Sequence, residues 1–120
     1  MIEKRNFAEL FSNFEDHWNP RIAAELNGQY VKLVKFQGDF VWHSHENEDE
    51  MFYVLEGSFR MELRDKSVEL GPGDFIVIPR GVEHRPVAEK ECSVVLFEPA
   101  TTLNTGNVVD VLTRRELETI

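Results

Sequence analysis

The sequence contains little cysteine. Cys92 is the only cysteine among 120 residues. A single thiol cannot form an intramolecular disulfide, so the pattern does not indicate a secreted, cross-linked fold. We interpret Cys92 as a packed thiol, because a free cysteine behaves as a small hydrophobic side chain. A cytoplasmic protein is the default expectation.

Long apolar runs are absent and basic residues are few. No stretch approaches the about 18 apolar residues of a membrane-spanning helix, and the first ten residues are charged where a signal peptide would be apolar. Thirteen Lys and Arg face 22 Asp and Glu, which gives a formal net charge of −9. This balance argues against nucleic acid or an anionic membrane surface as the main partner. We therefore expect no nucleic-acid partner and no membrane partner.

The chain does contain enough apolar material for one core. Its residues are 42% hydrophobic, and typical domains contain roughly 100 to 200 residues. We find no repeat, no low-complexity stretch and no linker. A single domain over residues 1–120 is expected.

Short strands dominate the predicted secondary structure. Turn residues recur every several positions, which is typical of an all-β sandwich or barrel. The expected strands span 21–26, 29–36, 40–45, 50–55, 59–63, 67–70, 75–78, 83–87 and 93–97. Between the first two lies Asn27-Gly28, a dipeptide that favours a two-residue hairpin turn.

Helical segments are expected only near the two ends. A short N-terminal helix is indicated by apolar residues at i, i+3, i+4 and i+7, which should pack on the core. These residues are Phe7, Leu10, Phe11 and Phe14. Thr113 and Glu116 have the spacing of a capping box. This spacing predicts a C-terminal helical turn over 114–119.

The strand expected at 50–55 is apolar on both faces. Phe52 and Val54 share the face of Glu50, and the opposite face carries Met51, Tyr53 and Leu55. Strands of this kind are usually covered on both faces. We expect the outer face to lie under the N-terminal helix or under a second subunit, and a homodimer is the expected assembly.

The stretch from Gly38 to Gly57 carries the clearest chemical signal. It contains His43, His45 and Glu50 with the spacing H-x-H-x4-E. Side chains alternate along a strand, so the two histidines should point the same way if 40–45 is extended. A turn through 46–49 would then begin a second strand at Glu50. Two imidazoles and one carboxylate could thus converge, a mixed nitrogen and oxygen set suited to a divalent transition metal.

A second motif, taken together with the first, indicates a resemblance to a known family. Residues 73–84 read GDFIVIPRGVEH, or G-x5-P-x-G-x2-H. Together with the first motif, this closely resembles the two conserved motifs of the cupin superfamily, over roughly residues 31–97 with the metal motifs within 38–88. The resemblance implies a small antiparallel β-barrel or jelly roll. It also implies a metal held by His43, His45, Glu50 and His84.

The chain departs from the family's pattern at two places. One residue fewer than usual separates Gly38 from His43, which changes the turn rather than the ligands. Ala88 stands where the second motif often has asparagine. The second departure and the lack of disulfide-forming cysteines weaken any likeness to the oxalate-handling seed cupins.

The implied ligand set is compatible with Fe, Mn, Ni, Co or Zn. Around an octahedral ion it would leave two adjacent positions open for water, dioxygen or a bidentate substrate, whereas a tetrahedral zinc would be fully occupied and structural. The first hypothesis is a metal-dependent, dioxygenase-like enzyme acting on a small oxygenated metabolite. The resemblance equally implies sugar or sugar-phosphate isomerases and epimerases. The net negative charge of the chain, however, does not favour a substrate that carries a phosphate. A non-catalytic module that binds or senses a small ligand is the hypothesis from a different class.

Other residues receive more modest interpretations. Four residues are candidates for the wall of a substrate pocket, and equally for plain core: Phe52, Val54, Met61 and Val94. A wide polar route to the metal would favour an enzyme, and a plugged lumen would favour a binding module. Arg60, Arg80 and Arg85 are expected to form surface ion pairs. We assign no catalytic acid or base.

Overall fold

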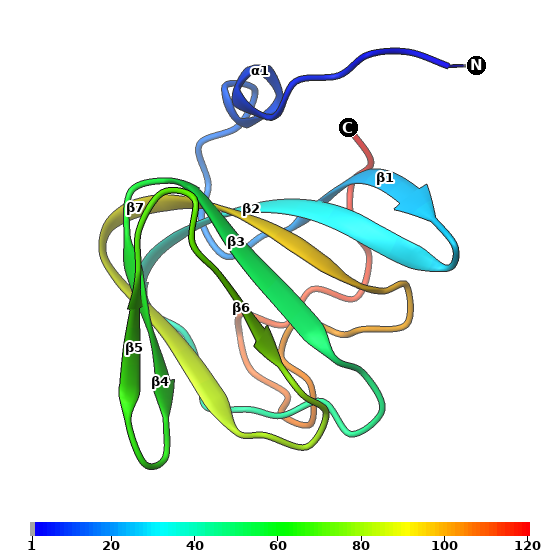
Figure 1. Cartoon of the computed structure of the whole chain (residues 1–120). Helices are drawn as coiled ribbons and strands as arrows, with labels where there is room; N and C mark the ends of the chain where they lie inside the picture. Colours follow the sequence, from blue (N-terminus) through cyan, green and yellow to red (C-terminus); the bar gives the residue numbers. More distant parts are fainter. Residues whose placement is uncertain (1) are drawn as a thin grey trace.

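The computed structural model describes residues 2–120, and antiparallel strands make up most of it (Figure 1). Within these residues one helix, α1 (Phe7–Phe11), precedes seven strands. The strands are β1 (Arg21–Leu26), β2 (Gln29–Asp39), β3 (Glu50–Glu56), β4 (Phe59–Leu63), β5 (Ser67–Leu70), β6 (Phe75–Ile78) and β7 (His84–Pro99). Their order is β1-β2-β7-β3-β6, and β4 pairs with both β5 and β7. This is the expected all-β jelly-roll architecture.

The hairpin between β1 and β2 forms as predicted. Leu26 pairs with Gln29 across the turn. Asn27 and Gly28 adopt φ values of 52° and 76°. Asparagine and glycine tolerate this left-handed conformation, which matches the twist of the flanking strands.

Strand β7 takes the place of two strands that were predicted separately, at 83–87 and 93–97. It runs for 16 residues without interruption and pairs with β2, β3 and β4. The polar sequence 89–91 indicated a break, but these residues stay extended and exposed. One continuous strand therefore links the β4 side of the barrel to β2 and β3.

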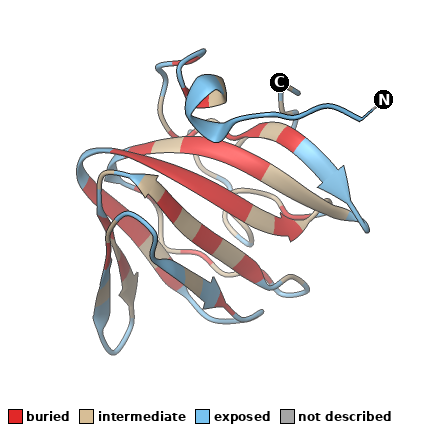
Figure 2. Ribbon diagram, turned by 45° about the horizontal axis from the view of Figure 1, so that its top comes forward, coloured by how far each residue is buried: buried red, intermediate tan, exposed pale blue. Residues whose placement is uncertain are grey.

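The inner faces of the strands follow the expected two-residue period. On β3, Glu50, Phe52 and Val54 are buried while the residues between them are half-buried, as the alternating bands of Figure 2 show. The inward residues of β2 and β7 complete the lumen. They are Lys32, Val34 and Phe36 on β2 and Val94, Leu96 and Glu98 on β7. Glu50, Lys32 and Glu98 are thus three charged residues on a largely apolar inner surface.

The N-terminal segment covers the outer face of the sheet. Of the two covers expected for this face, a helix or a second subunit, the first is present. Phe11 and Phe14 are buried against Leu33 and Val95, with Tyr53 and Leu55 packed alongside. The helix is shorter than the apolar stripe: α1 ends at Phe11, and Phe7 is 39% exposed. No helix in residues 2–120 has the length and apolar character needed to cross a membrane.

The C-terminal helical turn predicted over 114–119 does not form. The hydroxyl of Thr113 is already engaged, because it accepts from the Asp110 amide at 3.0 Å and lies 2.6 Å from the Thr105 hydroxyl. The segment beyond it runs along β1, where Ile22 donates to Glu118 and accepts from Ile120. Pairing with β1 therefore replaces the local capping interaction.

Candidate metal centre

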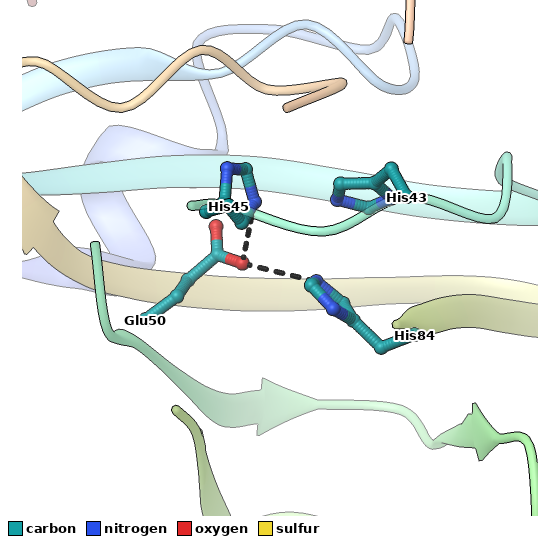
Figure 3. Close-up of side chains that lie close together, drawn as sticks. All are labelled: His43, His45, Glu50 and His84. Carbon is teal, nitrogen blue, oxygen red and sulfur yellow. Dashed lines mark ion pairs between the residues drawn. The ribbon is translucent and has the colours of Figure 1, made fainter. Parts of the chain in front are cut away.

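Four buried side chains converge at one end of the lumen. One ligand atom from each of His43, His45, Glu50 and His84 lies within 4.8 Å of the others. Figure 3 shows Glu50 between His45 and His84, with His43 on the same segment as His45. None of the four is more than 4% exposed. The sequence motifs therefore correctly identified residues that meet in space.

Different elements position the four side chains. Glu50 is the first residue of β3 and His84 the first of β7. The expected strand at 40–45 does not form; instead His43 makes an isolated bridge with His84, through N–O distances of 3.1 and 2.9 Å. His45 is held by its carbonyl, which accepts from the Gly81 amide at 2.8 Å. Convergence depends on these long-range contacts rather than on strand alternation.

Backbone carbonyls orient two of the imidazoles. The Nδ1 atoms of His43 and His84 lie 2.9 Å from the carbonyl oxygens of Val41 and Val82. A carbonyl can only accept, so each Nδ1 carries a proton, and in its neutral form each ring has the Nε2 lone pair that a metal would use. In the turn before Glu50, Asp49 pairs with Arg80 instead.

The centre combines a carboxylate with neutral imidazole. Glu50 Oε1 lies 3.3 Å from Nε2 of both His45 and His84. Burial alone would raise the pKa of Glu50, but the contacts from His45 and His84 outweigh it and hold this pKa well below its usual range. Burial, followed by the charge of His84, lowers the pKa of His43 to about 4. At neutral pH Glu50 is therefore ionised and His43 is a neutral donor.

Several polar atoms of the centre have no hydrogen-bond partner. Among residues 2–120, these buried atoms include both ring nitrogens of His45, Glu50 Oε1 and His84 Nε2. Leaving such groups unsatisfied costs roughly 1 to 3 kcal/mol each. A divalent cation would satisfy the nitrogen lone pairs and the carboxylate together, so the donor set fits a metal ion of the kind that mixed imidazole and carboxylate ligands prefer.

A narrow cavity adjoins this centre. His43 and Glu50 lie on its wall, together with aromatic rings of which Trp18 stacks on Phe36 and Phe40 at 4.5 and 4.8 Å. About 30 Å³ is open to the centre of a water molecule, room for roughly two waters. Only a small molecule, or one end of a larger one, fits without movement of these side chains.

The polar wall of the cavity is a buried ion pair. Lys32 Nζ lies 3.2 Å from Glu98 Oε2 and 3.3 Å from the carbonyl of Thr102. Burial, then the charge of Glu50, raises the pKa of Glu98 well above its usual range, and Lys32 opposes this rise. This pair was not predicted from the sequence. The two-residue alternation of the strands could have revealed it, because Lys32 and Glu98 both fall on inward-facing positions of mostly apolar strands.

The structure separates the four residues proposed as pocket walls. Phe52 lines the cavity. Val54, Met61 and Val94 lie in the same apolar cluster but outside the set of lining residues. Trp18, which was not among the predicted pocket residues, does line it. Its sequence neighbours gave no periodic signal, because Trp18 lies in an irregular segment at φ 58°.

The remaining expectations concern the surface and the thiol. Arg60 and Arg85 both pair with Glu62, and Arg80 pairs with Asp49. These contacts agree with the predicted surface ion pairs. Cys92 is fully buried, and this burial raises the pKa of its thiol to about 12.

Known proteins resemble this chain in sequence and in structure. The uncharacterised protein YdbB of Bacillus subtilis is 40% identical over 72 residues, which is 59% of this chain and 63% of YdbB. Quercetin 2,3-dioxygenase of Bacillus subtilis is 36% identical over 69 residues. Those residues are 52% of this chain but 20% of the dioxygenase. The chain thus spans less than two thirds of either curated relative.

A solved structure matches over more of its length. A cupin-2 domain containing protein from Shewanella frigidimarina is 47% identical, with a TM-score of 0.78, and the match covers 79% of this chain and 93% of that one. The model of the cupin domain family matches residues 30–98, which include all four converging side chains. The chain therefore belongs to the cupin domain family.

Proposed function

We propose that this protein binds one divalent transition metal through His43, His45, Glu50 and His84 and acts as a dioxygenase-like enzyme on a small oxygenated metabolite. The observation that carries the proposal is the convergence of three imidazoles and one carboxylate, all buried, beside a cavity. When bound, the metal would supply Lewis-acid or redox chemistry toward oxygen-containing ligands.

The protein's own residues would prepare the site. Val41 and Val82 hold two imidazoles in the tautomer that leaves Nε2 free. The apolar wall around Phe36 and Phe52 excludes bulk water, which strengthens electrostatic interactions inside the cavity. The likeness to quercetin 2,3-dioxygenase supports an oxygen-dependent reaction, although it covers 20% of that enzyme.

The narrowness of the cavity favours a second candidate, a non-catalytic module that binds a small ligand. About 30 Å³ of open space is closer to a filled lumen than to a wide polar channel. The residues that line the cavity do not support a sugar-phosphate isomerase. Among the described residues that line the cavity Lys32 is the one cation, and Glu98 already pairs with it.

Oxygen consumption separates these functions. The protein is purified without a nickel column, its metal is quantified by mass spectrometry, and it is reconstituted with Fe(II), Mn(II) or Ni(II). Oxygen uptake is then followed with small phenolic and enediol substrates. The matched control is His45→Ala, which removes one ligand from the irregular segment and leaves the strands intact.

Substrate-dependent oxygen uptake by the wild type, lost in His45→Ala, is the expected result. A redox-capable metal bound in stoichiometric amount, with no uptake and no turnover of any substrate, would instead assign the protein to the ligand-binding class. Zinc bound in stoichiometric amount would also assign the protein to the ligand-binding class.

A further inference from the structure

Three strands carry a continuous row of charged side chains across the lumen. The order β2-β7-β3 places β7 in the middle. Met51 pairs with Phe97, so the next residues along these strands, Glu50 and Glu98, lie side by side. Lys32 reaches Glu98 from β2. The row Lys32, Glu98, Glu50 therefore connects the metal centre to the far wall of the cavity.

Besides Glu50 Oε1, which belongs to the metal centre, one more oxygen of this row has no hydrogen-bond partner among the described residues, Glu98 Oε1. Glu98 is 1% exposed, and within residues 2–120 its Oε1 atom accepts and donates no hydrogen bond. Its other oxygen, Oε2, is held by Lys32 at 3.2 Å. Glu98 also lines the cavity next to Glu50. A buried polar atom of this kind costs free energy unless a ligand or water satisfies it.

The charges around Glu98 Oε1 determine which chemical group of a ligand could bind there. A carboxylate or phosphate would meet two acidic side chains, Glu50 and Glu98, and a cation already engaged by one of them. An ammonium group would lie beside the ammonium of Lys32. A neutral hydroxyl avoids both conflicts, and it can donate or accept, so it fits Glu98 Oε1 whether or not that carboxyl carries a proton.

We infer that Glu98, braced by Lys32, binds a hydroxyl group of a small neutral ligand and thereby selects hydroxylated compounds over carboxylates at this centre. Lys32 is a positioning residue, because it holds Oε2 and thereby fixes the carboxyl group that carries Oε1. The inference rests on the proposed metal-dependent function, since the same ligand is expected to reach the metal with its other oxygen.

Two three-carbon probes test the selection: hydroxyacetone, which is neutral and hydroxylated, and pyruvate, which is of similar size but anionic. Their dissociation constants are measured on cobalt-loaded protein from the visible absorption of Co(II). The ratio of the two constants is compared between the wild type and the double variant Lys32→Met/Glu98→Leu. Replacing both members of a buried pair by apolar residues of similar volume usually preserves the fold. Glu98→Gln is the second variant, which keeps the size of the side chain.

The control variant is His17→Gln/Glu91→Gln, which removes an ion pair of 2.8 Å outside the lumen. Cobalt content is measured for every protein. We expect full cobalt content throughout, with the preference for hydroxyacetone over pyruvate about ten-fold lower in the double variant, the loss expected for one hydrogen bond. The preference of the control should equal that of the wild type.

The inference is overturned if the double variant binds cobalt and keeps the wild-type preference. If the wild type itself binds no cobalt, the proposed function fails, and thermal unfolding of the metal-free proteins at high probe concentration decides the inference alone. A larger rise in melting temperature with hydroxyacetone for the wild type than for the double variant supports it; equal rises contradict it.

Discussion

Each of two imidazoles is fixed by a carbonyl only two residues earlier in the chain. His43 uses Val41 and His84 uses Val82, both at 2.9 Å. The histidines themselves were predictable because their spacing matches a known pair of motifs. The orienting carbonyls were not, since every residue has a carbonyl and the sequence does not say which one faces an imidazole.

Burial of His43 predicts a pH-dependent stability. Its pKa falls to about 4 in the folded protein, against an ordinary value of about 6.5. Between these values the unfolded chain binds more protons than the folded one, so acidification favours unfolding. For the metal-free protein, lowering the pH from 7 to 5 should remove about 2 kcal/mol of unfolding free energy through this group.

The measurement compares urea unfolding of the wild type and His43→Gln at both pH values. The difference is needed because the raised pKa of Glu98 acts with the opposite sign. We expect the wild type to lose stability relative to the variant on acidification. A constant difference between the two proteins would contradict a neutral, buried His43.

The thiol of Cys92 should be unreactive toward alkylating reagents in the folded protein. Burial raises its pKa to about 12, and only the thiolate reacts with alkylating reagents. At pH 8 about one thiol in ten thousand would be ionised, even before access is considered. Mass spectrometry should show no alkylation by iodoacetamide until denaturant is added. Rapid labelling of the native protein would show that this part of the core opens readily.

At the scale of elements, the loop after β7 clamps the histidine segment. Asn107 accepts from the Ser44 amide at 2.9 Å and donates its own amide to the Ser44 carbonyl at 3.0 Å. Gly106 lies directly against that carbonyl, where a Cβ atom would collide with it. The segment that carries two ligands thus depends on a loop about sixty residues away, a pairing that no local pattern encodes.

Gly106→Ala should therefore damage both the fold and the metal centre. The added methyl must displace the backbone of Ser44, beside His45, at a cost of about 2 kcal/mol or more. The matched control is Gly38→Ala: Gly38 also has a left-handed φ, 85°, but an added Cβ would meet no described atom within 4 Å. That variant should lose about 1 kcal/mol from backbone strain alone.

Unfolding free energy and cobalt affinity are measured for both glycine variants. We expect weaker cobalt binding only in Gly106→Ala. Equal affinities in the two variants would show that the C-terminal loop does not position His45.

Element predictions succeeded where the signal was local. Asn27-Gly28 specified its hairpin through its own backbone preferences. The failures share another cause, competition from distant partners. Strand β7 continues through polar residues because β2 pairs with both of its halves. The capping box at Thr113 gives way because Asp110 and Thr105 occupy its hydroxyl.

At the scale of the whole molecule, the sheet separates two apolar clusters. One fills the lumen around Phe52 and Leu96, and the other lies under the N-terminal segment around Phe11 and Phe14. The second cluster lies on the outer face of the sheet that carries Leu33 and Val95. Stability and metal binding should consequently respond differently to mutations on the two faces.

Phe14→Ala tests this separation. Removing a buried phenylalanine costs about 3 kcal/mol, so unfolding should occur at lower denaturant concentration. The cobalt content of the folded protein should stay at the wild-type value, because Phe14 packs on the opposite face from Glu50. Loss of cobalt at a concentration of denaturant where the variant remains folded would show that the two faces are coupled.

We propose that His43, His45, Glu50 and His84 bind one divalent transition metal. Equilibrium dialysis of metal-free protein against Co(II), with the metal quantified by mass spectrometry, tests this for the wild type and His45→Ala. We expect about one equivalent of cobalt for the wild type and a sharp loss for the variant. The same stoichiometry and affinity in both proteins, or no binding by the wild type, would contradict it.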